Sequence, residues 1–124
     1  MPKKGKTVAV LGASPKPERY SNQAVKALLE HGYDVIPVNP IAEKIHGLTS
    51  LESLDDIPGQ VDTLTVYINQ RLSWKLCKPI IKLNPRRAIF NPGSENFELE
   101  RLLAERGVEI VHACTLVMLR TDQF

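Results

Sequence analysis

Short apolar runs recur along the chain at intervals that suggest a sheet with covering helices. Most of these runs are rich in β-branched or aromatic residues, and they are continuous rather than alternating. Continuous apolar character is typical of strands that are buried on both faces of a sheet. We therefore predict five strands, at Thr7–Gly12, Asp34–Val38, Asp62–Ile68, Arg86–Phe90 and Val108–His112.

Helical patterns lie between the predicted strands. Apolar residues fall on one helical stripe in Ser21–His31 and again in Ser94–Arg106. Gln70–Leu83 keeps the same spacing, but Pro79 within it should kink or break the helix. The less regular stretch Leu48–Ile57 predicts a loop with a short helix.

Strands that alternate with helices predict an α/β fold. Parallel strands require crossover connections, which place helices on both faces of the sheet. We predict a Rossmann-like, doubly wound, parallel five-stranded sheet with strand order 3-2-1-4-5. The length of 124 residues suits a single domain spanning residues 1–124.

The predicted strand order also locates a ligand. In open α/β sheets, ligands bind outside the carboxyl ends of the strands, where the strand order reverses. The order 3-2-1-4-5 puts that crevice between the first and fourth strands, at Gly12-Ala13-Ser14 and Asn91-Pro92-Gly93. Both segments consist of small, polar or turn-forming residues, as a crevice that admits a ligand requires.

The segment after the first strand has the composition of a phosphate-binding loop. Gly12 would allow backbone amides to approach a phosphate, and the amino terminus of the next helix would add partial positive charge. Lys16 and Arg19 would neutralise a diphosphate, and Ser21 and Asn22 would offer hydrogen bonds. The alternative is an ordinary strand-to-helix turn with solvated cations.

The residues do not form the dinucleotide fingerprint. Its second and third glycines would fall at Ser14 and Pro17, and Asn39 stands where NAD-binding proteins usually have a carboxylate. The missing carboxylate suits a ligand with a phosphate on its ribose, to which Lys44 would pair. Coenzyme A has such a 3′-phosphate and NADP a 2′-phosphate, whereas plain NAD fits less well.

Two motifs resemble a known family. Within Val8–Pro40, a Gly-Ala-Ser turn is followed by K-P-x-R, and the segment ends in G-Y-x-V-x-P-V-N-P. This pattern resembles the CoA-binding domain family, small Rossmann-fold proteins related to the CoA-binding domain of succinyl-CoA ligase alpha subunits. Later pieces agree in order, so the resemblance covers nearly the whole chain: Gly47, Ser53-Leu54, Ile57-Pro58, Val61-Asp62, Asn91-Pro92-Gly93 and Gly107.

The resemblance implies roles for individual residues. The diphosphate would bind at Gly12, Ala13, Ser14, Lys16 and Arg19, and the adenosine would lie beside Val38, Asn39 and Pro40. We add Asn69 and Asn91 because of their positions at strand ends. Tyr20 departs from the family, since many relatives have a small residue there. The ligases have a phosphorylatable histidine and an ATP-grasp partner, which this chain does not match, so ligase activity is not implied.

Charge, hydropathy and cysteine content argue against several classes of partner. The net charge is only +2, and we interpret the one dense basic cluster, at Lys3, Lys4 and Lys6, as a solvated tail, which disfavours nucleic acid. No apolar run approaches the roughly 20 residues that span a bilayer. The lack of a signal-peptide pattern and of paired cysteines leads us to expect a cytoplasmic protein.

The sequence contains no clear catalytic constellation. The histidines lack metal-ligand spacing, and we expect no metal site. His112 and Cys114 follow the last strand, where they would form either a Cys–His nucleophile or an inert buried pair. We expect a small binding, carrier or sensor protein for CoA or acyl-CoA, with enzymatic activity left open and any protein partner unidentified. The alternatives are a small NADP-dependent oxidoreductase and a ligand-free Rossmann interaction module.

Overall fold

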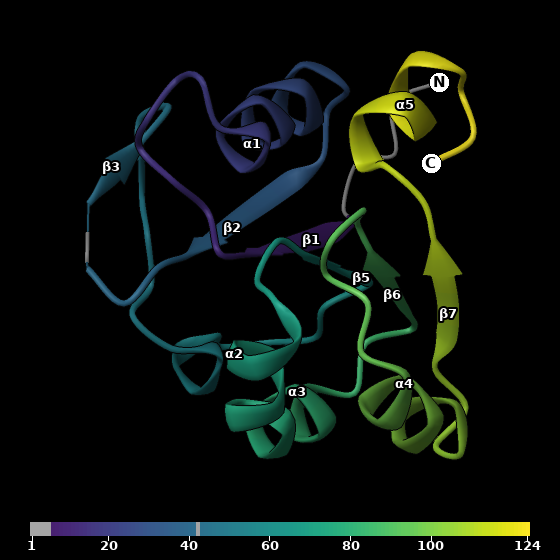
Figure 1. Ribbon diagram of the computed structural model, residues 1–124. Coiled ribbons are helices and arrows are strands. Elements are labelled where there is room, and N and C mark those ends of the chain that lie inside the picture. The colour runs from purple at the N-terminus through teal and green to yellow at the C-terminus, as the bar shows by residue number, and fades with distance from the viewer. Residues whose placement is uncertain (1–5, 42) are drawn as a thin grey trace.

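A five-stranded parallel sheet forms the centre of the molecule (Figure 1). The structure is a computed structural model that describes residues 6–41 and 43–124, so Lys3 and Lys4 of the basic cluster lie outside the described residues. The sheet has the order β2-β1-β5-β6-β7. Its strands are β1 (Thr7–Leu11), β2 (Asp34–Val38), β5 (Thr63–Val66), β6 (Arg87–Phe90) and β7 (Glu109–His112).

Helices cover both faces of the sheet, which confirms the predicted fold class. In Figure 1, α1 and α5 lie on one side of the sheet, and α2, α3 and α4 lie on the other. Right-handed crossovers place α1 and the group α2–α4 on opposite faces, because the chain steps from β1 to β2 in one direction and from β5 to β7 in the other. α5 follows the last strand and belongs to no crossover. The helices are α1 (Tyr20–Glu30), the 3-10 helix η1 (Leu54–Asp56), α2 (Gln70–Lys75), α3 (Cys77–Leu83), α4 (Phe97–Ala104) and α5 (Thr115–Arg120).

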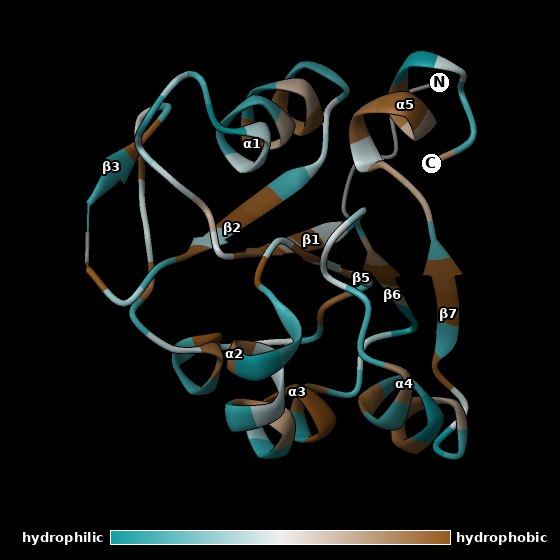
Figure 2. Cartoon of the chain, viewed as in Figure 1, coloured by the Kyte–Doolittle hydropathy of each residue, from teal (hydrophilic) through white to brown (hydrophobic). Residues whose placement is uncertain are grey.

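The core consists of one apolar layer on each face of the sheet. Leu64 and Phe90 pack in the layer beneath α3 and α4, whereas Val8 and Val10 pack with Leu28 in the layer beneath α1. Figure 2 shows the strands as mostly brown ribbons between helices that are brown and teal. Every residue of β5 and β6 is buried, including the threonines that alternate with Leu64 and Val66 in β5, as expected of strands covered on both faces.

The strand order differs from the prediction in one respect. The predicted third strand, β5, pairs with β1 and β6, whereas we had placed it outside β2. Leu51 occupies that outer edge instead: it forms a parallel bridge with Val38, and its amide donates to the Pro37 carbonyl at 2.9 Å. The order reversal, and with it the expected crevice, therefore lies between β1 and β5 rather than between β1 and β6.

Two stretches of the chain are less regular than the rest, the predicted helix that contains Pro79 and the connection before β5. The Gln70–Leu83 pattern divides at Leu76 into α2 and α3, and Pro79 lies in the first turn of α3, where its missing N–H has no helical partner to lose. The stretch before β5 contains the predicted short helix, η1, and a hairpin that we did not predict, β3 (Lys44–Ile45) with β4 (Leu48–Thr49). No helix in residues 6–41 and 43–124 is long and apolar enough to cross a membrane.

Candidate functional site

The loop after β1 is fixed by close packing at Gly12. The φ angle of Gly12 is +89°, and a Cβ at this position would lie 2.7 Å from Ile68 Cγ2 and 3.0 Å from the Tyr67 carbonyl oxygen. The amides of Gly12 and Ala13 both donate to the Val38 carbonyl at 3.1 Å. The loop is therefore attached to the end of β2, and these two amides do not point at a ligand as the sequence had suggested.

A polar cavity of about 330 Å³ opens beside this loop. Lys16 and Arg19 are exposed, and neither forms an ion pair with another described residue. Cations, hydroxyls and a helix amino terminus together form an environment that favours an anion. The cavity is lined by Gly12, Ser14, Lys16, Arg19, Tyr20, Ser21 and Tyr67.

The amino terminus of α1 at this cavity has no side-chain cap. Its N-cap is Arg19, and no side chain in the described part of the chain accepts a cap hydrogen bond there. By contrast, Asn69 caps α2 and Asn96 caps α4 through their side-chain oxygens. The first-turn amides of α1, beside Ser21, thus lack the partner that capping gives to the other two helices.

Two asparagine side chains hold the carbonyl groups of the loop. Asn39 Nδ2 donates to the Ala13 carbonyl at 2.6 Å, and Asn22 Nδ2 donates to the Ser14 carbonyl at 2.9 Å. Asn39 Oδ1 accepts from the Ile41 amide, so the hydrogen-bonding atoms of this side chain are engaged within the chain. Asn22 and Asn39 thus make contacts that shape the loop, and their contacts with a ligand stay a prediction.

A second, apolar cavity of about 350 Å³ also contacts Gly12. Its walls come from the ends of β1 and β2, from η1 and from α2 and α3, and most of them are aliphatic. Such walls suit a flat or apolar group rather than a charged one. The lining residues are Leu11, Gly12, Val38, Pro40, Glu52, Ser53, Leu54, Ile68, Leu72, Lys75, Leu76 and Pro79.

The remaining predicted site residues lie elsewhere. Lys44, on β3, is not among the residues around either cavity. Asn69 accepts a hydrogen bond from the Leu72 amide at 2.9 Å as the cap of α2. Asn91 is buried, donates to Thr65 Oγ1 at 2.7 Å and accepts from the Thr115 amide at 2.8 Å. Because β5 lies between β1 and β6, Asn91 is also one strand away from Gly12.

Sequence reasoning missed Tyr67 as a member of the site. Burial raises the pKa of this phenol to about 12. The hydroxyls of Thr115 and Thr65 bond each other at 2.8 Å, and Tyr67 Oη has no hydrogen-bond partner among the described residues. Tyr67 lies within the predicted strand Asp62–Ile68 and was therefore interpreted as a strand residue. Only its position near the carboxyl end of that strand could have indicated that it lies beside the crevice.

His112 and Cys114 do not form a nucleophile pair. His112 Nε2 instead contacts Glu100 Oε1, and Glu100 Oε2 accepts from the Asn96 amide at 2.8 Å. Glu100 is only 6% exposed, so it anchors the imidazole to the first turn of α4. Cys114 precedes α5 as its N-cap residue.

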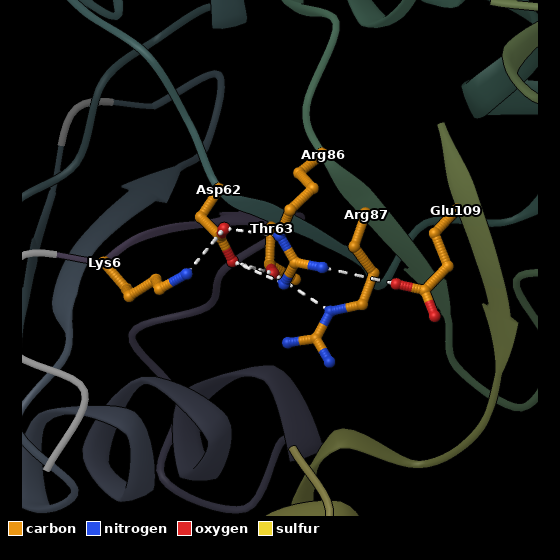
Figure 3. A network of polar contacts seen from close by, with 6 residues as sticks. All are labelled: Lys6, Asp62, Thr63, Arg86, Arg87 and Glu109. Carbon is orange, nitrogen blue, oxygen red and sulfur yellow. Dashed lines mark hydrogen bonds and ion pairs between the residues drawn. The ribbon is translucent and has the colours of Figure 1, made fainter. Parts of the chain in front are cut away.

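The opposite edge of the sheet has a different electrostatic character. Figure 3 shows Asp62 between Lys6 and Arg86, with Arg86 Nε 2.7 Å from Asp62 Oδ1. Arg86 holds the pKa of the Asp62 carboxyl well below its usual range, mainly through this hydrogen bond. A cavity of about 450 Å³ opens here, and Lys6 and Arg86 beside it are paired with carboxylates, whereas Arg106 forms no ion pair with another described residue. Lys16 and Arg19 at the carboxyl edge differ from Lys6 and Arg86 in having no such partner.

Known proteins resemble the chain over most of its length. An uncharacterized protein of known crystal structure is 43% identical, with a TM-score of 0.90 and coverage of 96% of this chain and 98% of that chain. The uncharacterized protein YneT of Bacillus subtilis (strain 168) is 28% identical over 120 residues, which are 90% of this chain and 89% of that protein. Neither protein's name states a function.

A third relative is a much larger enzyme. ADP-forming acetate–CoA ligase I of Archaeoglobus fulgidus is 32% identical over 127 residues, and the match covers 94% of this chain but 18% of the ligase. The family model described as "CoA binding domain" matches residues 6–120, which include both cavities and the whole sheet. The chain therefore belongs to the CoA binding domain family.

Proposed function

We propose that this protein binds coenzyme A or an acyl-CoA across the carboxyl edge of the sheet. One observation favours this ligand above others: an anion-binding cavity and an apolar cavity meet at Gly12. Coenzyme A has the matching chemistry, because its charged diphosphate adjoins an adenosine with a flat base. Membership of the CoA binding domain family supports the same assignment.

In this proposal the diphosphate occupies the polar cavity. Lys16 and Arg19 neutralise its charge, Ser14 and Ser21 supply hydroxyl donors, and the uncapped first turn of α1 supplies amides. A helix amino terminus stabilises a nearby anion by about 0.3–1 kcal/mol, and charge-assisted hydrogen bonds are stronger. The two side chains should therefore contribute more affinity than the helix.

The adenosine occupies the apolar cavity beside Val38 and Pro40. The prediction that Lys44 binds the 3′-phosphate has a rival in Lys75, because Lys75 lines this cavity and Lys44 does not. The affinities of Lys44→Ala and Lys75→Ala for CoA and for dephospho-CoA show which lysine binds the phosphate. The variant that lacks this lysine should bind the two compounds with equal affinity, whereas the other variant should still prefer CoA.

We propose a binding, carrier or sensor role rather than a catalytic one. Four polar side chains near this edge are bonded within the chain: Asn22, Asn39, Asn91 and His112. The proposed function is therefore recognition of the cofactor, with no reaction step assigned.

Isothermal titration of CoA into the wild-type protein and Arg19→Ala tests the proposal. Loss of a charge-assisted hydrogen bond of about 1.5–3 kcal/mol should weaken binding by about ten- to a hundredfold. Arg120→Ala, an equivalent change at an exposed residue of α5, should leave affinity unchanged. Equal affinities for wild type and Arg19→Ala would remove the diphosphate from this cavity.

Thermal shifts with CoA, NADP, NAD and ATP compare the alternative ligands. A hundredfold excess over Kd should stabilise the fold by about 2.7 kcal/mol. A shift with NADP alone would favour the oxidoreductase alternative, and no shift with any nucleotide would favour an interaction module.

A further inference from the structure

The tip of the β3–β4 hairpin contains a histidine in an unusual conformation. Ile45 pairs with Leu48, so His46 and Gly47 form a two-residue turn, and their φ angles are +50° and +82°. Two consecutive positive φ angles are typical of the type I′ turn, in which Asn, Asp or Gly is preferred at the first position. Histidine is not the least costly residue here, so its side chain is the feature to explain.

That side chain reaches the first turn of α1. His46 Nε2 lies 2.7 Å from Asn22 Oδ1, and Asn22 Nδ2 donates to the Ser14 carbonyl at 2.9 Å. Because Nδ2 faces a carbonyl, Oδ1 must be the acceptor for the imidazole, and Nε2 must be protonated. The neutral Nε2–H tautomer and the imidazolium both meet this requirement.

The hydrogen bond fixes which end of the Asn22 amide faces the loop. Asn22 is 5% exposed, so solvent has little access to it. If the amide rotated by half a turn, Oδ1 would face the Ser14 carbonyl and two acceptors would repel each other. With Nε2 protonated, His46 is a donor that favours Oδ1 on its own side, so the contact opposes that rotation.

The Ser14 carbonyl matters because Ser14 lines the polar cavity. A carbonyl oxygen that turned toward the cavity would repel an anion, and its bond to Asn22 Nδ2 holds it elsewhere. The hairpin that supplies His46 is closed at its base by Ser50 Oγ, which accepts from the Glu43 amide at 2.9 Å. His46 is therefore attached to a braced hairpin.

We propose that His46 is a positioning residue for the anion site. Through Asn22 it orients the loop carbonyl at Ser14, and it does not touch the ligand. The proposal rests on the proposed function, because it assigns His46 to the cavity in which the CoA diphosphate would bind. It extends the site to a hairpin 24 residues away from Asn22 in sequence.

Two substitutions separate positioning from a role in turn stability. His46→Asn suits the turn, but its shorter side chain ends before the place of Nε2. His46→Gln is no better suited to the turn than histidine, but it offers an amide donor at about the distance of Nε2. We expect His46→Asn to change the unfolding temperature little, because the better turn residue offsets the loss of the donor to the buried Asn22 Oδ1. It should still bind CoA and inorganic pyrophosphate about fivefold more weakly, as the loss of one neutral hydrogen bond implies. His46→Gln should regain most of that affinity.

His31→Asn is the matched control. His31 lies at the other end of α1, where its Nδ1 contacts the Ala27 carbonyl, and its replacement should not change the affinity for CoA. Wild-type affinity in both His46→Asn and His46→Gln would overturn the positioning role. Failure of the wild-type protein to bind CoA would instead overturn the proposed function, so the two failures are distinguishable.

Discussion

Gly12 is the residue at which backbone conformation and packing constrain the sequence together. Alanine there would hold a positive φ and would place its Cβ against the Tyr67 backbone and Ile68. We expect Gly12→Ala to lower the free energy of unfolding by about 2–4 kcal/mol, from left-handed strain and overpacking combined. Urea unfolding measures the change. Gly59→Ala, with open space around the added methyl group, is the control, and equal midpoints for the two variants would contradict the prediction.

The asparagines show where residue-level prediction from sequence stops. Asn22, Asn39 and Asn91 were assigned to a ligand because amides at strand ends and helix starts suit a nucleotide. The positions were informative, since all three lie at or near the carboxyl edge. An amide serves a ligand or the backbone equally well, however, and only the folded chain shows that their hydrogen bonds are made to Ser14, Ala13, Thr65 and Thr115.

At the scale of elements, the hydrophobic pattern predicted the strands correctly, but it did not predict the position of β5 in the strand order. Each predicted strand exists. Apolar composition marks the buried strands β5 and β6, and it also marks the edge strand β7, although no residue of β7 is fully buried. The position of β5 depended on the connection Pro40–Gln60, which has no sustained periodicity. A single bridge between Leu51 and Val38 covers the outer edge of β2 there. A contact of one residue leaves no pattern in the sequence, so the strand order could not be derived from it.

The cap of α4 provides a test at the same scale. Asn96 is 1% exposed; its Oδ1 accepts from the Leu99 amide and its Nδ2 donates to Ser73 Oγ at 2.8 Å, which joins α4 to α2. Asn69 caps α2 from an exposed position. We expect Asn69→Ala to cost about 1 kcal/mol as a lost cap, and Asn96→Ala about 2–4 kcal/mol because buried partners are left unpaired. Denaturant titration ranks the two variants, and equal losses would show that the bond between helices adds nothing.

Across the whole molecule, the two edges of the sheet differ in how their charges are paired. The carboxyl edge has the features of a binding site, and the ion pairs at the amino edge contribute to stability. At the carboxyl edge, Lys16 and Arg19 have no carboxylate partner within residues 6–41 and 43–124, which is unfavourable for the empty site and favourable for an anionic ligand. At the amino edge, Asp62 and Glu109 compensate Lys6 and Arg86 (Figure 3). Added salt should therefore weaken ligand binding more than it weakens the fold, because the Asp62 carboxylate, which pairs with both Lys6 and Arg86, is largely shielded from solvent.

The Asp62 network predicts how stability depends on pH. Its folded-state pKa is depressed by Arg86, so the ionised carboxylate stabilises the fold at every pH above the unfolded value of about 4. Below that value the unfolded chain takes up a proton before the folded protein does, and the stabilisation declines. Asp62→Asn should therefore be about 2 kcal/mol less stable than wild type at pH 7, and the difference should narrow as the pH falls to 3. Urea midpoints at several pH values measure this, with Asp34→Asn as the control for loss of an exposed carboxylate. A difference that stays constant down to pH 3 would mean that the Asp62 charge does not stabilise the sheet edge, and that shape rather than ion pairing joins β5 to β6 there.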